Sequence, residues 1–152
     1  MPDKDASTPR VFLIRHGETE WSQSGRYTGS TEIPLTSHGQ EQVRATRKIT
    51  YGAGKLIDPA KIAKVWVSPR DRAVKTYQLL SGQEDGYETT ESLEEWNYGY
   101  VGSSLLGAGC LLTRVREYEG LLPKEIKEKR ASQGLDQDRK WNMWRDGCVG
   151  GE

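Results

Sequence analysis

The sequence has few of the residues that build disulfide-rich or metal-dependent folds. Its two cysteines, Cys110 and Cys148, lie far apart without CxxC spacing, so we expect neither a disulfide framework nor a metal site. No apolar run approaches the length of a membrane span, and the polar N-terminus lacks the apolar centre of a secretory signal. These absences favour a reducing compartment, which we take to be the cytosol, with the nucleus left open.

Net charge is also missing. The 22 Lys and Arg residues balance 22 Asp and Glu residues, so no overall field attracts nucleic acid or an anionic membrane. The length of 152 residues suits one domain with a modest core. We expect residues 1–9 to be a disordered lead-in and residues 10–152 to form one partial domain. The sequence leaves open whether the protein forms a homo-oligomer.

What the chain does contain is a short apolar run that ends in polar residues. Val11–Ile14 is typical of a strand buried on both faces, and it stops at Arg15, His16 and Gly17. Ligands bind at the carboxyl ends of strands in open α/β sheets. A guanidinium group there could fork onto two phosphate oxygens while an imidazole nitrogen faces phosphorus. The alternative is an ordinary strand end with solvated polar residues.

A loop and two helices can be placed from local signals. Residues 23–34 are rich in Gly, Ser and Thr, so this loop could offer backbone N–H groups to an anion or be a plain surface connection. Thr36 is a good N-cap for a helix that stops before the break at residues 51–54. A charged helix starts at Pro123, and residues 133–140 are expected to be a polar linker.

A second strand is expected over residues 62–67, and a short one over residues 87–90. The second strand ends at Ser68, and a helix that begins at Ser68 or Pro69 continues to about Leu80. Arg70 and Arg72 therefore come at a helix N-terminus, which favours anions. The alternative for either arginine is a surface ion pair that contributes little.

A pair of carboxylates lies in an aromatic stretch further along the chain. Glu94 and Glu95 are followed by Trp96 and Tyr98, and a carboxyl group enclosed by bulky aromatics suits acid catalysis. Without further support, two glutamates on a solvated face would be the simpler interpretation.

Together these segments resemble the histidine phosphatase (phosphoglycerate mutase-like) superfamily. The matching stretches are Arg15–Trp21, Tyr27-Thr28-Gly29, the Leu-Thr-x-x-Gly helix start, Ser68–Thr76 and Leu93–Gly99. The resemblance implies an α/β fold, a three-layer sandwich with a mostly parallel sheet and flanking helices. It also implies that the fold is incomplete at the C-terminus of this chain.

The resemblance implies a role for each matching residue. His16 would attack phosphorus and become phosphorylated, while Arg15 and Arg72 hold the phosphoryl oxygens. Glu95 would protonate the leaving oxygen and then activate water. The substrate-binding residues implied, some by their motif and some as pocket candidates, are Ser22, Tyr27, Thr28, Gly29, Trp96, Trp141 and Arg145. No metal or cofactor is required.

The same resemblance bears on the substrate. Trp96 and Asn97 stand where many mutases carry Arg and His, and residues 140–148 resemble a fungal branch of the family that includes sedoheptulose-1,7-bisphosphatase. We therefore expect a phosphatase of a small phosphorylated sugar, with a sugar bisphosphate as the substrate. A mutase or broad phosphomonoesterase is one alternative, and a catalytically impaired chain that only binds phosphorylated ligands is another.

Two departures from the family pattern stand out. Residues 100–116 interrupt a segment that would otherwise read Asn-Tyr-Gly-Glu-Tyr-Glu-Gly-Leu in frame, and we expect them to be a retained intron, with a functional loop as the alternative. The family also has a second catalytic histidine in a Gly-His or Ala-His-Gly context. The two histidines here are His16 and His38, and His38 is expected to be exposed and structural. A C-terminally truncated chain is therefore expected.

Overall fold

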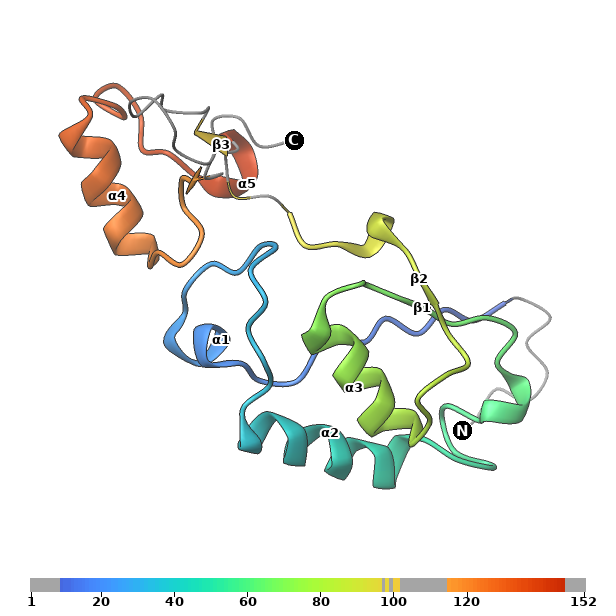
Figure 1. Ribbon diagram of the computed structural model, residues 1–152. Helices are drawn as coiled ribbons and strands as arrows, with labels where there is room; N and C mark the ends of the chain where they lie inside the picture. The colour runs from blue at the N-terminus through green and yellow to red at the C-terminus, as the bar shows by residue number, and fades with distance from the viewer. Residues whose placement is uncertain (1–8, 97, 99, 102–114, 147–152) are drawn as a thin grey trace, which may run out of the picture. The chain divides into compact units, whose positions relative to one another are not determined.

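The computed structural model describes residues 9–96, 98, 100–101 and 115–146 (Figure 1). The chain divides into two compact units, which are described separately. Unit 1 comprises residues 1–19 and 32–93, and unit 2 comprises residues 20–31 and 94–152. The predicted lead-in falls outside the described residues except for Pro9. The expectation of one partial domain over residues 10–152 stays a prediction.

The elements of each unit follow the chain order. Unit 1 contains α2 (Ser37–Thr50), η1 (Pro59–Lys61), β1 (Trp66–Val67), α3 (Asp71–Ser81), β2 (Glu88–Thr89) and η2 (Glu91–Leu93). Unit 2 contains α1 (Glu20–Ser24), β3 (Tyr100–Val101), β4 (Val115–Arg116), α4 (Pro123–Ser132) and α5 (Met143–Asp146).

The predicted helices of unit 1 are present, and α2 packs against α3 (Figure 1). Thr36 is the N-cap of α2, as predicted, and its hydroxyl oxygen accepts a hydrogen bond from the Gly39 amide at 2.9 Å. Helix α3 begins at Asp71 rather than at Ser68 or Pro69. Its N-cap residue is Arg70, which makes no side-chain cap. The apolar faces of the two helices contribute Val43 and Leu80 to the core of unit 1.

The strands of unit 1 are parallel but short. Strand β1 pairs with β2, with Trp66 opposite Glu88 and Val67 opposite Thr89. The predicted strand over residues 62–67 is therefore confirmed only at its carboxyl end. Since a strand is defined by its paired neighbour, β1 extends no further than its ladder with β2. The pair still places residue 68 and the start of α3 at one end of a parallel ladder.

The apolar run at the start of the chain is not the buried strand that the sequence predicted. Residues 11–14 form no strand, and Val11, Leu13 and Ile14 are 80%, 90% and 52% exposed. Four apolar residues favour a strand only if a neighbouring strand is available to pair with them. Among the described residues no strand pairs with this run.

Unit 2 is built on a small aromatic core. Tyr98, Tyr118 and Ile126 are buried, and Tyr27, Leu121 and Trp141 pack against them. Ile126 comes from α4, which begins at Pro123 as predicted. The Glu125 carboxylate accepts a hydrogen bond from the Leu122 amide at 2.6 Å, which satisfies one of the N–H groups at the start of α4.

The buried arginine at the end of α4 is held by three partners. Arg130 donates to both oxygens of Asp136 at 2.7 Å and to the Tyr118 hydroxyl at 2.8 Å. Its guanidinium group also lies 4.9 Å from the Trp141 ring. Hydrogen bonding from Arg130 holds the pKa of Asp136 below its usual range. Asp136 itself has a φ of 68°, a left-handed conformation that Asp and Asn tolerate better than most residues.

The two ends of the interrupting segment, residues 100–116, pair with each other as the antiparallel strands β3 and β4. Tyr100 pairs with Arg116 and Val101 with Val115. The Tyr118 amide donates to the Tyr98 carbonyl at 3.1 Å, which continues the same register toward the core. Residues 102–114, and with them most of the segment interpreted as a retained intron, lie outside the described residues.

This register predicts that residues 100–116 can be deleted without loss of the fold of unit 2. In the shortened chain, Tyr98, residue 99, Glu117 and Tyr118 become four consecutive residues. The hydrogen bond from the Tyr118 amide to the Tyr98 carbonyl would then close a β-turn, with Gly at the second position as a type II′ turn requires. We expect the free energy of unfolding to change by no more than about 1 kcal/mol, measured by thermal or urea denaturation.

A matched deletion of residues 100–115 leaves one extra residue in the returning segment. It shifts the register by one, which turns Tyr118 to the opposite face. We expect this variant to be clearly less stable than the first deletion. Equal stability of the two deletions would contradict the ladder.

The Arg130–Asp136 pair predicts an acid-dependent loss of stability. Because the pKa of Asp136 is lowered on folding, its contribution is present above its unfolded pKa of about 3.9 and is lost as the pH falls through the lowered value. We expect Asp136→Asn to lower Tm at pH 7 and the two proteins to converge in acid. Asp138→Asn, at an exposed neighbouring position, is the control and should not change Tm. Identical Tm values for Asp136→Asn and wild type at neutral pH would contradict this role.

Candidate active site

A buried hydroxyl group joins the two predicted phosphate motifs of unit 1. Thr76, on α3, accepts a hydrogen bond from the Gly17 amide at 3.1 Å and donates to the Arg72 carbonyl at 2.7 Å. Its side chain is only 4% exposed, so these bonds form away from competing water. The turn that carries His16 is therefore tied to the helix that carries Arg72.

Close backbone packing holds the same turn against α2. A Cβ atom on Gly17 would lie 2.8 Å from the Gly39 carbonyl oxygen and 2.9 Å from a Val43 methyl group. A Cβ atom on Gly39 would lie 2.2 Å from the Glu18 carbonyl oxygen. Both positions need glycine because no side chain fits between the turn and the start of α2.

Polar contacts reinforce this packing. The Thr36 amide donates to the Glu18 carbonyl and the Thr36 hydroxyl donates to the Glu18 carboxylate, both at 2.9 Å. Thr19, which is fully buried, forms a β-bridge with Leu35. The residues that follow His16 are thus fixed to the N-terminal end of α2.

The hydrogen bonding of His16 determines which of its ring nitrogens carries the proton. Nδ1 lies 2.8 Å from the carbonyl oxygen of Gly17, and a carbonyl oxygen can only accept. Nδ1 therefore carries the proton in the neutral ring, and Nε2 keeps the lone pair. A neutral imidazole whose lone pair is on Nε2 can act as a nucleophile.

The two predicted phosphate-binding arginines differ in environment. Arg15 is exposed, whereas Arg72 is 3% exposed in the first turn of α3. A buried guanidinium group is costly unless anionic or polar partners surround it. Such a group is held in position before an anion arrives, and it interacts more strongly with the anion than an exposed group does.

An internal carboxylate already occupies the N-terminus of α3. Glu32 accepts hydrogen bonds from the Asp71 amide at 3.0 Å and from the Arg70 guanidinium group at 3.1 Å. The helix terminus was predicted to be an anion site, and the anion that it binds here is a side chain of the chain itself. Of the two arginines in this motif, Arg70 pairs with Glu32.

In unit 2 the predicted substrate loop is held by another glutamate. Gly29 is buried, while Tyr27 and Thr28 are half-buried. The amides of Gly29 and Thr31 both donate to Oε1 of Glu119, at 3.1 and 2.6 Å. The sequence suggested that the amides of this loop bind a substrate anion, but these two bind Glu119.

The proposed acid and its neighbour also lie in unit 2. Glu95 is exposed rather than enclosed by aromatics, and its Oε1 accepts the Trp96 amide at 3.3 Å. Trp96 is half-buried, and its carbonyl oxygen lies against Gly29. The enclosure that the sequence suggested for Glu95 is therefore absent among the described residues.

The remaining predicted residues of unit 2 have local partners. Trp141 packs 5.5 Å from the Tyr118 ring, between ring centroids, and belongs to the aromatic core. Arg145 is exposed and forms a two-pronged ion pair with Asp146 at 2.7 and 2.9 Å. Hydrogen bonding from Arg145 holds the pKa of Asp146 well below its usual range. Ser22 is exposed on α1, and His38 is exposed on α2, as expected.

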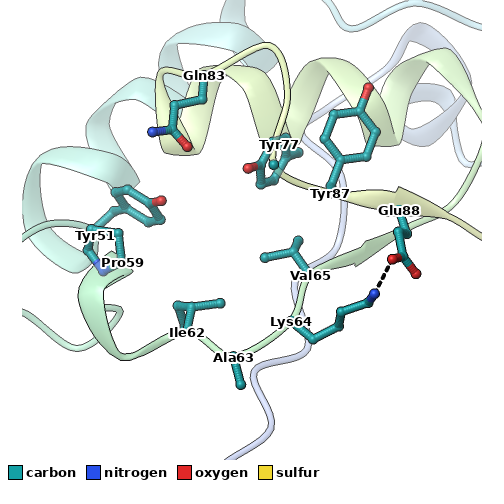
Figure 2. Close-up of a pocket in the computed structure, with 11 residues that line it drawn as sticks. Tyr51, Pro59, Ile62, Ala63, Lys64, Val65, Tyr77, Gln83, Tyr87 and Glu88 are labelled. Carbon is teal, nitrogen blue, oxygen red and sulfur yellow. Dashed lines mark hydrogen bonds and ion pairs between the residues drawn. The ribbon is translucent and has the colours of Figure 1, made fainter.

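Unit 1 also contains an open cavity of about 330 Å³, lined in part by Tyr51, Tyr77 and Tyr87 (Figure 2). It lies beside the residues that precede β1, and none of the predicted site residues lines it. Lys64 and Glu88, at its edge, form an ion pair with each other. With its cation neutralised, this cavity does not suit a phosphate group.

Sequence analysis missed two of the residues that shape these segments. Glu32 and Glu119 gave no local signal, because their partners are distant in the sequence. Thr76 ends the family motif Ser68–Thr76, and that motif is the signal available for it in the sequence. Within the described ranges, no cluster of three or more His, Cys, Asp or Glu side chains could hold a metal ion. In those ranges, no helix is long and apolar enough to cross a membrane.

Comparison with known proteins identifies the fold and the family of this chain. A solved structure of an open reading frame product from Mycobacterium tuberculosis superimposes with a TM-score of 0.59 at 32% identity, covering 90% of this chain and 54% of that one. The parallel pair of β1 and β2, with helices packed beside it, has the α/β character of the phosphoglycerate mutase-like fold that this neighbour shares. The chain belongs to the histidine phosphatase superfamily (branch 1), whose model matches residues 11–103.

Two curated relatives align along most of the chain. Sedoheptulose 1,7-bisphosphatase of Saccharomyces cerevisiae is 40% identical, over 95% of this chain and 50% of the yeast protein. An acid phosphatase of Mycobacterium tuberculosis is 34% identical, over 94% of this chain and 55% of that protein. The chain therefore spans about half the length of these relatives.

The Thr76 bridge predicts a specific stability loss. Thr76→Val keeps the shape of the side chain but leaves the buried Gly17 amide without its acceptor, so we expect the free energy of unfolding to fall by about 1–3 kcal/mol. Thr76→Ser keeps the hydroxyl group and should recover most of this loss, apart from the missing methyl group. Urea denaturation of the three proteins measures both values. If Val were tolerated as well as Ser, the hydrogen bond would not hold the turn.

Proposed function

We propose that the protein is a phosphatase that removes phosphate from a small phosphorylated sugar, with a sugar bisphosphate such as sedoheptulose 1,7-bisphosphate as its substrate. The observation that carries the proposal is the hydrogen-bonded link between the turn of a candidate nucleophile and the helix of a buried cation. His16 keeps its lone pair on Nε2, and the Thr76 hydroxyl ties its turn to the helix of Arg72. The name and 40% identity of the yeast relative support the substrate.

The first step forms a phosphohistidine. Nε2 of His16 attacks phosphorus while the bond between phosphorus and the sugar oxygen breaks. Arg15 and Arg72 neutralise the charge on the phosphoryl oxygens as it develops. Glu95 donates its proton to the departing sugar oxygen, so that an alcohol leaves rather than an alkoxide.

The second step regenerates the imidazole. The Glu95 carboxylate takes a proton from water as the water oxygen attacks phosphorus, and the bond from phosphorus to Nε2 breaks to release inorganic phosphate. Glu95 belongs to unit 2, and its role follows from the family resemblance. Tyr27 and Thr28 orient the sugar, with Ser22, Gly29, Trp96, Trp141 and Arg145 as further binding residues. We place this activity in the cytosol.

The histidine pair of this chain provides the test. We expect His16→Ala to lower kcat on sugar bisphosphates by roughly 1,000-fold or more, because no other group supplies the nucleophile. His38→Ala is the matched control, since His38 is exposed on α2 and contacts Gln42. Its activity should equal that of the wild type. Rapid acid-free quenching followed by mass spectrometry should find one phosphoryl group on wild type and on His38→Ala, and none on His16→Ala.

The same purified proteins also test which substrate the chain prefers and whether the chain turns over any substrate. A higher kcat/KM on phosphoglycerate isomerisation than on sugar bisphosphate hydrolysis would favour the mutase alternative. Equal hydrolysis of many unrelated phosphomonoesters would favour the broad-specificity alternative. Phosphate ligands that bind without turnover would indicate an impaired chain, and would overturn the proposal.

A further inference from the structure

The loop of residues 27–31 carries an internal anion. Oε1 of Glu119 accepts hydrogen bonds from the amides of Gly29 and Thr31, at 3.1 and 2.6 Å. Two converging amides are the arrangement that binds a phosphate or carboxylate oxygen in many anion sites. In this loop the anion is a side chain that comes from 88 and 90 residues further along the chain.

The backbone on either side of Glu119 fastens the same loop. The Tyr27 amide donates to the Leu121 carbonyl at 3.1 Å, and the Gly120 amide donates to the Tyr27 carbonyl at 2.8 Å. Arg26 also donates to the Gly120 carbonyl, at 2.6 Å. These hydrogen bonds place residues 119–121 along the loop, so that its conformation depends on them.

The loop has little room to adopt another conformation. A Cβ atom on Gly29 would lie 3.0 Å from the Trp96 carbonyl oxygen and 3.2 Å from the Tyr98 ring. The Tyr27 and Tyr98 rings pack with their centroids 4.9 Å apart. Aromatic packing therefore supports one side of the loop, while the Glu119 carboxylate satisfies its amides.

We propose that Glu119 is a positioning residue for substrate binding: it fixes the loop in the conformation in which Tyr27 and Thr28 contact the sugar. This inference rests on the proposed function and adds a statement about specificity. Because a carboxylate already takes the Gly29 and Thr31 amides, the loop contacts neutral hydroxyl groups of the sugar rather than a phosphate group. A second anion at these amides would meet a negative charge instead of free donors.

Removal of the carboxylate tests the inference in two ways. In Glu119→Ala the amides of Gly29 and Thr31 lose their acceptor, so we expect their hydrogen exchange to become at least about tenfold faster. The KM for the sugar bisphosphate should rise about tenfold with kcat within about twofold, because contacts to the sugar that are equal in the ground and transition states are weakened and the phosphoryl groups are untouched. Glu119→Gln keeps an oxygen acceptor and should stay near the wild type in both measurements.

Chemical rescue separates positioning from a general loss of stability. Added formate can occupy the space left in Glu119→Ala and accept the same two hydrogen bonds. We expect it to restore slow exchange at Gly29 and Thr31 and to lower KM, with no effect on the wild type. Glu128→Ala is the control: it removes a carboxylate from the exposed face of α4, where Glu128 pairs with Lys124. It should leave both readouts unchanged.

The outcomes are distinguishable from those of the proposed function. Unchanged exchange in Glu119→Ala, or faster exchange with an unchanged KM, overturns the positioning role while leaving the phosphatase proposal intact. If the wild type shows no turnover, the phosphatase proposal fails, and calorimetric binding of the sugar bisphosphate replaces KM. A tenfold weaker Kd in Glu119→Ala then supports the inference. An unchanged Kd, or no binding to the wild type, overturns it.

Discussion

The hydroxyl group of Thr76 is the interaction on which the arrangement of unit 1 depends. It accepts from the Gly17 amide and donates to the Arg72 carbonyl, so one buried side chain relates the turn after His16 to the first turn of α3. The close approach of Gly17 to Gly39 then brings the start of α2 to the same turn. Three segments that are distant in the sequence converge there, and each depends on a residue that tolerates little change.

Glutamate side chains satisfy backbone N–H groups in both units. Glu32 accepts a hydrogen bond from the first amide of α3, and Glu119 accepts from two amides of the loop of residues 27–31. Glu125 accepts from the amide that precedes α4. These donors would otherwise attract free anions. Since they are occupied, the proposed mechanism assigns recognition of the phosphoryl group to two cationic side chains, Arg15 and Arg72.

Local signals in the sequence predicted the helices well. Thr36 as an N-cap, and Pro123 at the first position of α4, act within one helical turn and were both confirmed. The exception is the start of α3, which begins at Asp71. The run Val11–Ile14 failed as a predicted strand because strand formation depends on a neighbour, which the residues of the run cannot specify.

The candidate site was only partly predictable for the same reason. The motif around His16 identified the family, which the comparisons confirmed, while the roles of Arg15, Arg72 and Glu95 stay predictions. The burial of Arg72 and the contacts of Glu119 arise from packing between distant segments. A carboxylate that binds amides some 90 residues away leaves no local pattern to detect. The sequence of the helix start alone could not show that the Glu32 carboxylate binds the N-terminus of α3.

The exposed run at residues 11–14 has a consequence for how the polypeptide behaves in solution. Val11, Leu13 and Ile14 place an apolar surface beside backbone that is paired with no strand among the described residues. Such an edge is a template for β-pairing between molecules. We therefore expect self-association of this chain to rise with protein concentration and to begin at residues 11–14, just before His16. Additional charged residues introduced before Val11 should oppose this pairing.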